Sequence, residues 1–169
     1  YKGCRFYEGL VRVPLIFSWP AGGIVRDQRS DALVELLDLS ATILELGGLD
    51  IPEHHQGRSL LPLLQGEADP ADHRDSVRCE YFDALASHFT GGHGAFATMY
   101  RTRHHKLSLY HSIDEGELYD LGSDPWEHDD LFHSEDSGIT SLRSELILRS
   151  FHSHVNLTTD VGSERIAPM

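Results

Sequence analysis

The first twelve residues place basic side chains beside glycines, a combination suited to holding an anion. Lys2 adjoins Gly3, Arg5 and Arg12 follow in the same segment, and Gly9 supplies a second flexible point. Glycine lets the backbone approach a ligand closely, and lysine carries a compact positive charge. Composition alone would make Lys2 an ordinary solvated lysine. Its setting makes it the first candidate for contact with an anionic group.

Two acid–base candidates have structural interpretations. Glu8 and Arg12 lie within one short segment, and we expect them to form an ion pair that holds this loop rather than to act in catalysis. The pairs His54-His55 and His104-His105 have the residue type of metal ligands. Adjacent residues of a strand point to opposite faces, so a single ion would hardly use both members of the second pair.

His93 stands apart from the other histidines because it lies in a glycine-rich loop, S-H-F-T-G-G-H-G, between two predicted strands. Loops of this kind often carry recognition. We therefore consider His93 a candidate substrate contact, with an exposed or structural histidine as the alternative.

Composition excludes several classes of partner. The 27 acidic residues outnumber the 14 Lys and Arg residues and give a formal net charge of -13, which argues against nucleic acid and against anionic membranes, although the 12 His could offset part of it in mild acid. No stretch reaches the roughly 18 apolar residues of a membrane span. Cys4 and Cys79 are too few for a disulfide framework, and we expect both to be buried free thiols.

The elements that must position these residues begin with an apolar run. Residues 13–17 read as a strand covered on both faces, of the kind found in parallel sheets. A helix is predicted from a Ser30 N-cap through leucines at helical spacing to Gly47, and a short helix from Ser59 to Leu64, ending at Gly66. Such a strand and helix are an α/β unit.

A polar, turn-rich stretch at residues 67–75 is the best domain boundary, because the pattern changes from helical to alternating after it. Alternation predicts an antiparallel sheet of four strands, with one face in water, at residues 76–82, 95–100, 106–110 and 117–121. A last helix is predicted from residue 137 or 138 to about 154, with an apolar stripe that could cover the sheet: Ile139, Leu142, Leu146 and Phe151.

Three motifs in order resemble the sulfatase branch of the alkaline-phosphatase-like hydrolases. They are K-G-x-x-x-Y-E-G-x-x-R-V-P-L-I from Lys2, G-R-S-L-L-P-L-L from Gly57 and G-E-L-Y-D-L from Gly116. The resemblance implies that Lys2 contacts the sulfate. It also implies the fold, an α/β class in which residues 1–75 are the C-terminal end of a doubly wound catalytic domain and residues 76–169 are a small antiparallel-sheet subdomain covered by a helix.

The same resemblance implies chemistry that needs more than these residues. Sulfatases use a formylglycine nucleophile made from a Cys or Ser in C/S-x-P-x-R, and neither cysteine here has that context. A divalent metal, expected to be Ca²⁺, would be held mainly by ligands upstream. The chain starts at Tyr1 within a motif, so we expect it to be the C-terminal piece of a longer protein, inactive alone, whose substrate is a sulfated small molecule or glycan.

Two alternatives stay open. A phosphonate or phosphate monoester hydrolase of the same superfamily would share the loop and the fold. A non-catalytic binding module is a different class, against which the apolar opening half argues, because in such a module that half would be exposed.

The third motif extends to G-E-L-Y-D-L-x-x-D-P-x-E-x-x-D-L and contains an acidic run. We expect Leu118 and Leu121 to be buried and Glu127, Asp129 and Asp130 to be solvated. The run lacks the alternating oxygen ligands and central glycine of an EF-hand, so its role is predicted to be structural.

Overall fold

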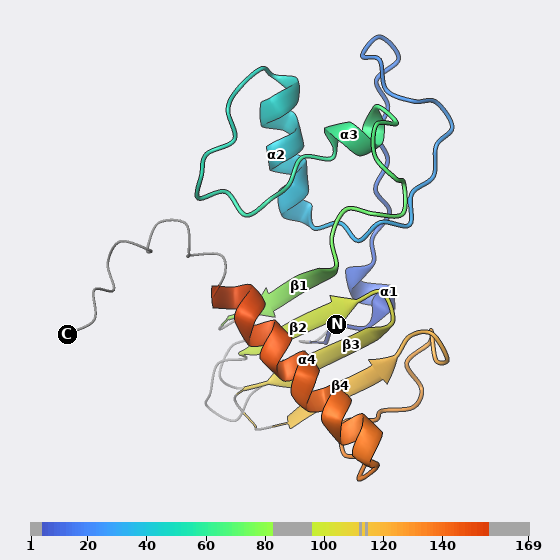
Figure 1. Ribbon diagram of the computed structural model, residues 1–169, viewed down its shortest axis with the longest axis vertical. Coiled ribbons are helices and arrows are strands. Elements are labelled where there is room, and N and C mark those ends of the chain that lie inside the picture. Colours follow the sequence, from blue (N-terminus) through green and yellow to red (C-terminus); the bar gives the residue numbers. More distant parts are fainter. Residues whose placement is uncertain (1–4, 83–95, 112, 114, 156–169) are drawn as a thin grey trace, which may run out of the picture. The chain divides into compact units, whose positions relative to one another are not determined.

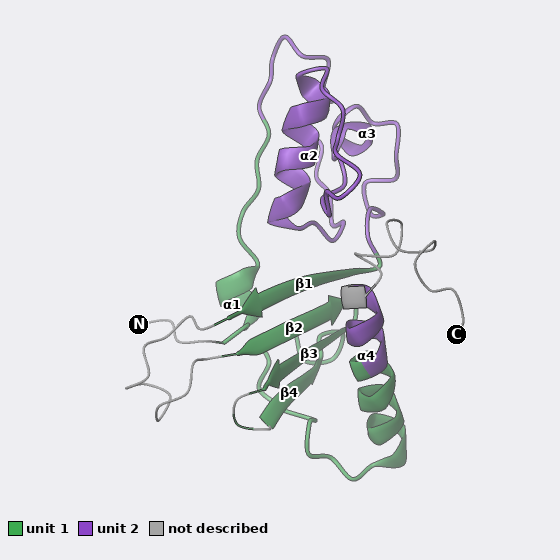
Figure 2. Ribbon diagram, turned by 90° about the vertical axis from the view of Figure 1, so that its left-hand side faces the viewer, with its two compact units in different colours: residues 1–17, 75–147 green, residues 18–74, 148–169 purple. Residues whose placement is uncertain are grey.

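The structure is a computed structural model that describes residues 5–82, 96–111, 113 and 115–155. Its described parts group into two compact units, one from residues 1–17 and 75–147 and the other from residues 18–74 and 148–169 (Figure 2). The predicted division at residue 75 into two domains of a longer protein stays a prediction. The elements are α1 (Glu8–Val11), α2 (Leu36–Leu46), α3 (Leu61–Leu64), β1 (Ser76–Tyr81), β2 (Ala97–Thr102), β3 (His105–Tyr110), β4 (Glu115–Asp120) and α4 (Ser137–Val155).

The first unit is built on the predicted four-stranded sheet. Its strands follow the chain in the order β1-β2-β3-β4, and each neighbouring pair is antiparallel (Figure 1). The alternating pattern located all four strands, with bounds that shift by one or two residues. The sheet prediction is therefore confirmed.

Helix α4 covers one face of this sheet, as the sequence predicts (Figure 1). Tyr100, Leu107, Leu118 and Leu146 form the buried core there. Ile139 and Leu142 from the predicted stripe pack against it. Phe151 was wrongly included, since its side chain is 63% exposed. At 3.6 residues per turn, Leu146 is followed on the same face by Ser150, which is buried, and not by Phe151.

The opposite face of the sheet is also buried, so the expectation of one wet face was wrong. Phe6 packs there against Ala97, Met99 and Tyr110. The side chains of Lys106, Ser108 and Glu117 on this face are buried although they are polar. The cover is the N-terminal segment of the same unit, which the alternating pattern of the strands does not reveal.

The predicted strand at residues 13–17 does not form. The segment is extended but belongs to no sheet in the described part of the chain, and Ile16 is 86% exposed. An extended run becomes a strand only when a neighbour supplies its hydrogen bonds. Val13 and Leu15 are likewise exposed.

The second unit contains α2 and α3. Helix α2 begins at Leu36 and not near Ser30. The Ser30 hydroxyl accepts the Ala32 N–H at 3.2 Å and donates to the Pro70 carbonyl at 2.5 Å, but residues 31–35 do not form a helix. At the actual start, the Asp38 carboxylate accepts the Glu35 N–H at 2.9 Å. Helix α3 forms as predicted, with the Ser59 hydroxyl accepting from the Leu61 N–H and a turn at Gly66, whose φ of +74° favours glycine.

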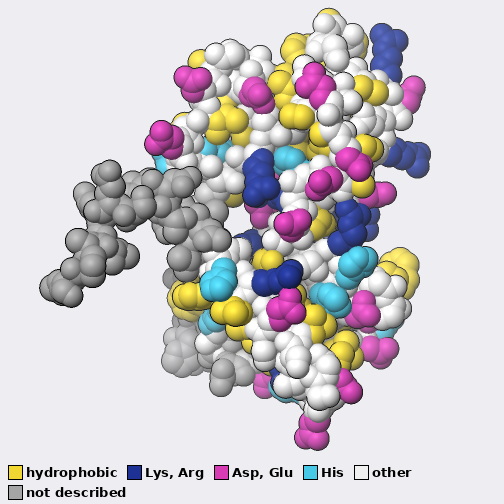
Figure 3. Space-filling view, viewed as in Figure 1, with side chains coloured by type: hydrophobic (Ala, Val, Ile, Leu, Met, Phe, Trp, Pro, Cys, Tyr) yellow, Lys and Arg dark blue, Asp and Glu magenta, His cyan; other side chains and the backbone are white. Residues whose placement is uncertain are grey.

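Apolar side chains are exposed among the charged residues on the surface of the second unit (Figure 3). Leu36 is 71% and Ile43 is 66% exposed on α2. Within the residues that the structure describes, no helix combines the length and the apolar composition needed to cross a membrane.

Candidate functional site

Lys2 and His93, the two predicted site residues, both lie outside the described residues, and so does Cys4. Arg5, three peptide bonds after Lys2, is the first described residue of the segment. Residues 5–11 end in the single turn α1, in which the N–H groups of Leu10 and Val11 donate to the Tyr7 carbonyl at 2.7 and 3.1 Å.

The sheet face under this segment carries two cations side by side. Arg101 of β2 and Lys106 of β3 are direct partners across the antiparallel ladder, so their side chains share a face. Glu8 lies between them. Arg101 Nε and Nη2 donate to its two carboxylate oxygens at 2.9 and 3.2 Å, and Lys106 Nζ donates at 3.2 Å. The predicted pair of Glu8 with Arg12 does not form, because Glu8 has these stronger partners.

A second carboxylate, Glu127, completes the charge balance around Lys106. Its side chain is 3% exposed and forms an ion pair with Lys106, whose side chain is 1% exposed. The other oxygen of Glu127 accepts the Glu8 N–H at 2.7 Å. The expectation that Glu127 is solvated was therefore wrong. Its φ of +60°, uncommon for a residue with a side chain, is maintained by these partners.

Lys106 also reaches the backbone of the N-terminal segment. Its Nζ donates to the Phe6 carbonyl at 2.7 Å. Three acceptors thus surround the ammonium group, two of them charged, which is what a buried lysine requires. Burial alone would raise the pKa of Glu8, but Arg101 and Lys106 outweigh burial and hold that pKa below its usual 4.5.

Glu117 of β4 binds the start of the segment. Arg5 Nη1 donates to Glu117 Oε1 at 2.5 Å, and the hydroxyl groups of Tyr110 and Tyr7 donate to Glu117 at 2.8 and 3.4 Å. The Arg5 guanidinium also lies 4.6 Å from the centroid of the Tyr110 ring. Burial raises the pKa of Tyr110, and the Glu117 carboxylate adds to this, so the phenol stays protonated and remains a donor.

These contacts define a group of side chains that we call the anchor cluster: Arg101, Lys106, Tyr110, Glu117 and Glu127. This cluster was not predicted from the sequence. One signal was present, because Lys106 stands in a strand whose neighbours Leu107 and Leu109 point to the α4 face, on the opposite side of the sheet. A lysine on a covered face needs an anion, and two of the candidates were Glu8 and Glu127.

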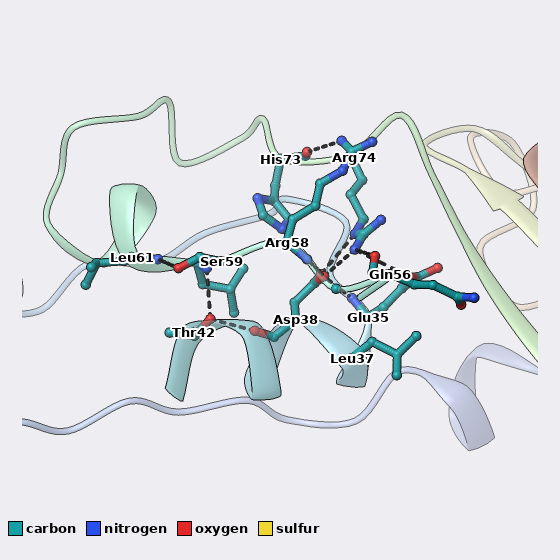
Figure 4. Close-up of polar contacts among 12 residues, drawn as sticks. Glu35, Leu37, Asp38, Thr42, Gln56, Arg58, Ser59, Leu61, His73 and Arg74 are labelled. Carbon is teal, nitrogen blue, oxygen red and sulfur yellow. Dashed lines mark hydrogen bonds and ion pairs between the residues drawn. The ribbon is translucent and has the colours of Figure 1, made fainter. Parts of the chain in front are cut away.

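The second unit has its own buried polar network around Asp38 of α2 (Figure 4). Its carboxylate accepts from the guanidinium of Arg74, from the Arg58 N–H at 2.7 Å and from the Glu35 N–H at 2.9 Å. Burial would raise the pKa of Asp38, but Arg74 and the two N–H groups outweigh it and keep the pKa below 3.8.

His73 Nε2 lies 3.3 Å from Asp38 Oδ2. Burial, reinforced by the charge of Arg74, lowers the pKa of His73 below its usual 6.5 against the opposing effect of Asp38. Thr42 extends the network, since its hydroxyl accepts the Leu60 N–H at 2.9 Å. The network joins α2 to the second motif through the bonds that Asp38 and Thr42 accept from the N–H groups of Arg58 and Leu60, so we assign it a structural role.

The histidine pairs do not form metal sites in the described residues. The rings of His104 and His105 have centroids 6.5 Å apart at 70°. His55 Nε2 instead lies 2.9 Å from the Ser40 hydroxyl. Asp130 accepts the Leu118 N–H at 3.0 Å, so the acidic run is structural there. Among the residues that are described, no three His, Cys, Asp or Glu side chains are grouped to hold a metal ion.

Comparison with known proteins matches nearly the whole chain to one family. The family model described as N-sulphoglucosamine sulphohydrolase, C-terminal, covers residues 2–151. An N-acetylglucosamine-6-O-sulfatase of Bacteroides thetaiotaomicron is 35% identical over 128 residues, which are 75% of this chain and 22% of that protein. The chain thus spans less than a quarter of the length of this curated relative.

Solved structures are also similar to this chain. A sulfatase-family structure from Bacteroides thetaiotaomicron superposes with a TM-score of 0.78 at 26% identity, over 99% of this chain and 35% of that one. A second structure, solved in complex with its substrate D-glucosamine-2-N,6-O-disulfate, has a TM-score of 0.59 at 27% identity, over 76% of this chain and 25% of that one. These matches confirm the predicted fold class, with its small antiparallel sheet and C-terminal helix.

Proposed function

The chain belongs to the sulfatase family as the C-terminal portion of such an enzyme, and from this we propose that the protein containing it hydrolyses sulfate esters. The substrate class that we propose is a sulfated sugar or another small sulfate ester. This is supported by the name of the 6-O-sulfatase relative and by the disulfated glucosamine bound to the second solved structure.

We place the nucleophile and the divalent metal in sequence outside this chain. The nucleophile would be a formylglycine. The metal would be Ca²⁺, whose positive charge would offset the negative charge of the sulfate oxygens. The small share of each relative that this chain spans supports this placement. The 169-residue chain alone is then expected to hydrolyse no sulfate ester.

Within this chain, Lys2 is the residue that we propose for the active site. Its ammonium group would neutralise sulfate oxygens as charge develops on them. Lys2 lies in the first of the three sulfatase-like motifs, and the family model covers this motif. His93 is proposed as a contact to the rest of the substrate, with an exposed or structural histidine as the alternative.

The test uses the full-length enzyme and a matched pair of esters. Wild type should hydrolyse an aryl sulfate faster than the corresponding phosphate or phosphonate ester, and the opposite preference would replace sulfatase by the phosphonate-hydrolase alternative. Lys2→Ala should lower kcat/KM by about 10²–10³, the usual effect of losing one preorganised donor. Lys2→Arg should recover part of this, because it keeps the charge but not the compact shape.

Arg29→Ala is the matched control, since Arg29 is an exposed cation of the same chain. It should leave kcat/KM within about twofold of wild type, as expected of a surface substitution. A Lys2→Ala enzyme whose kcat/KM matched that of the Arg29→Ala control would remove Lys2 from the active site.

A further inference from the structure

We propose that Glu117 is a positioning residue for Lys2, because it binds Arg5 and so holds the described segment, residues 5–11, that follows Lys2 in the chain. The inference rests on the proposed function, because it assigns Glu117 a role through the lysine that we place against the sulfate. Glu117 lies on the sheet 112 residues after Arg5. It would therefore act on the reaction without touching the substrate.

The first observation is how the segment is attached. The backbone hydrogen bonds of α1 run within the segment itself, from Leu10, Val11 and Arg12 back to Tyr7 and Glu8. Residues 5–7 are not part of a strand. Attachment to the sheet therefore depends on side chains, namely Phe6 in the core and the anchor cluster at the polar ends.

The second observation is that Arg101 and Glu117 of the anchor cluster take partners of opposite charge, Glu8 and Arg5, from the segment. Arg101 and Lys106 are directly opposed like charges, and such a pair is unfavourable unless an anion lies between them. Glu8 supplies this anion. Equally, the Glu117 side chain is only 9% exposed and takes its positive partner from Arg5. The sheet thus selects one position for the segment at two separate points.

The third observation identifies Glu117 as the point that matters most for Lys2. The Glu8 contacts hold the start of α1, whereas Arg5 is the described residue closest to Lys2 in the chain. Glu117 receives three donors, from Arg5, Tyr110 and Tyr7, which fix its carboxylate in place. A carboxylate held in this way restricts where the Arg5 guanidinium can lie.

Glu115→Gln is the matched control for Glu117→Gln. Glu115 lies two residues earlier on β4, so its side chain points to the same side of the sheet. Its side chain is 51% exposed and pairs with His133. Both substitutions remove one carboxylate charge from the same strand and keep the side-chain shape.

Kinetics of the full-length enzyme test the role. A displacement of about 1 Å can cost on the order of 10²-fold in rate, so Glu117→Gln should lower kcat/KM by about 10- to 100-fold. Glu115→Gln should leave it within about twofold, as for other surface changes. In the Lys2→Ala background, Glu117→Gln should not lower kcat/KM further, because the ammonium group that Glu117 would position is absent.

Two kinetic outcomes overturn the proposal. One is a Glu117→Gln enzyme with the kcat/KM of wild type. The other is a full additional loss in the Lys2→Ala background, which would show that Glu117 acts independently of Lys2. Tyr110→Phe removes one donor that holds Glu117 and should show the same dependence on Lys2 with a smaller loss, which keeps the test decisive if Glu117→Gln does not fold.

Amide hydrogen exchange separates this proposal from the proposed function. Glu117→Gln should speed exchange across residues 5–11 while exchange in β2 and β3 stays as in wild type, and Glu115→Gln should change neither. If wild type hydrolyses no sulfate ester, the proposed function fails and the exchange data still decide whether Glu117 holds the segment. Unchanged exchange at residues 5–11 in Glu117→Gln would overturn the anchoring itself.

Discussion

Asp38 and His73 make the second unit sensitive to acid, and both act in the same direction. The pKa of each group is lower in the folded protein than its usual value. The unfolded chain therefore binds more protons than the folded chain once the pH falls below about 6.5 for the histidine and about 3.9 for the aspartate. Stability is fully present above these values and is lost as the pH falls through the folded pKa.

His73→Gln tests the first of these steps. The wild-type free energy of unfolding, measured with urea, should fall between pH 7.5 and pH 5.5, and it should fall less in His73→Gln because no buried imidazole remains to take up a proton. His128→Gln is the control, since His128 is exposed. Equal pH dependence in wild type and His73→Gln would contradict the assignment to His73.

At the residue scale, the sequence predicted the kind of interaction that a side chain makes better than it predicted the partner. Glu8 was expected to form an ion pair, and it does, but with Arg101, 93 residues away, rather than with Arg12. Glu127 was expected in water because its neighbours in sequence are acidic, yet Lys106 and the Glu8 N–H hold it inside. Pairing between distant segments depends on the fold, which local charge patterns do not encode.

At the scale of helices and strands, Gly57 lies so close to α2 that there is no room for a Cβ atom. A Cβ at position 57 would lie 2.1 Å from the Leu37 carbonyl oxygen, which belongs to the helix backbone. The glycine that begins the second motif is therefore required for close contact between this loop and α2.

Gly57→Ala should destabilise the protein by about 2–3 kcal/mol, a typical cost of overpacking. Gly9→Ala is the control, because a Cβ there would meet nothing within 4 Å and position 9 lies in α1. It should be neutral or stabilising by up to about 1 kcal/mol, the helix preference of alanine. Urea unfolding compares the two, and equal stability of both variants would show that the loop moves away from α2 without cost.

Helices and strands were predictable where a single pattern of apolar residues defined them. Alternation located the four strands, and helical spacing located α4 and the body of α2. The start of α2 was missed because Ser30 resembles a cap, and its hydroxyl accepts the Ala32 N–H, yet no helix follows it. At the true start, Asp38 accepts the N–H of Glu35. The apolar run at residues 13–17 was misread because strand formation requires a neighbour, which the run does not specify.

Across the whole molecule, backbone amides should be protected from hydrogen exchange most strongly in the sheet. The amides of β2 and β3 lie in ladders with a neighbour on each side, whereas residues 13–17 belong to no sheet in the described structure. Hydrogen exchange of the 169-residue chain should therefore be slowest across Ala97–Tyr110 and fast across residues 13–17. Stronger protection of residues 13–17 would mean that this run has a partner strand after all.

The separation of anchor and segment along the chain has a consequence for biosynthesis. Glu8 leaves the ribosome 119 residues before Glu127, and Arg5 leaves 112 residues before Glu117. At about 5–20 residues per second, the segment waits roughly 6–24 s for its partners. A chain that ends before Glu117 keeps Arg101 and Lys106 but lacks Glu117 and Glu127, the partners of Arg5 and of the Glu8 N–H. A later part of this chain thus holds an earlier part in place.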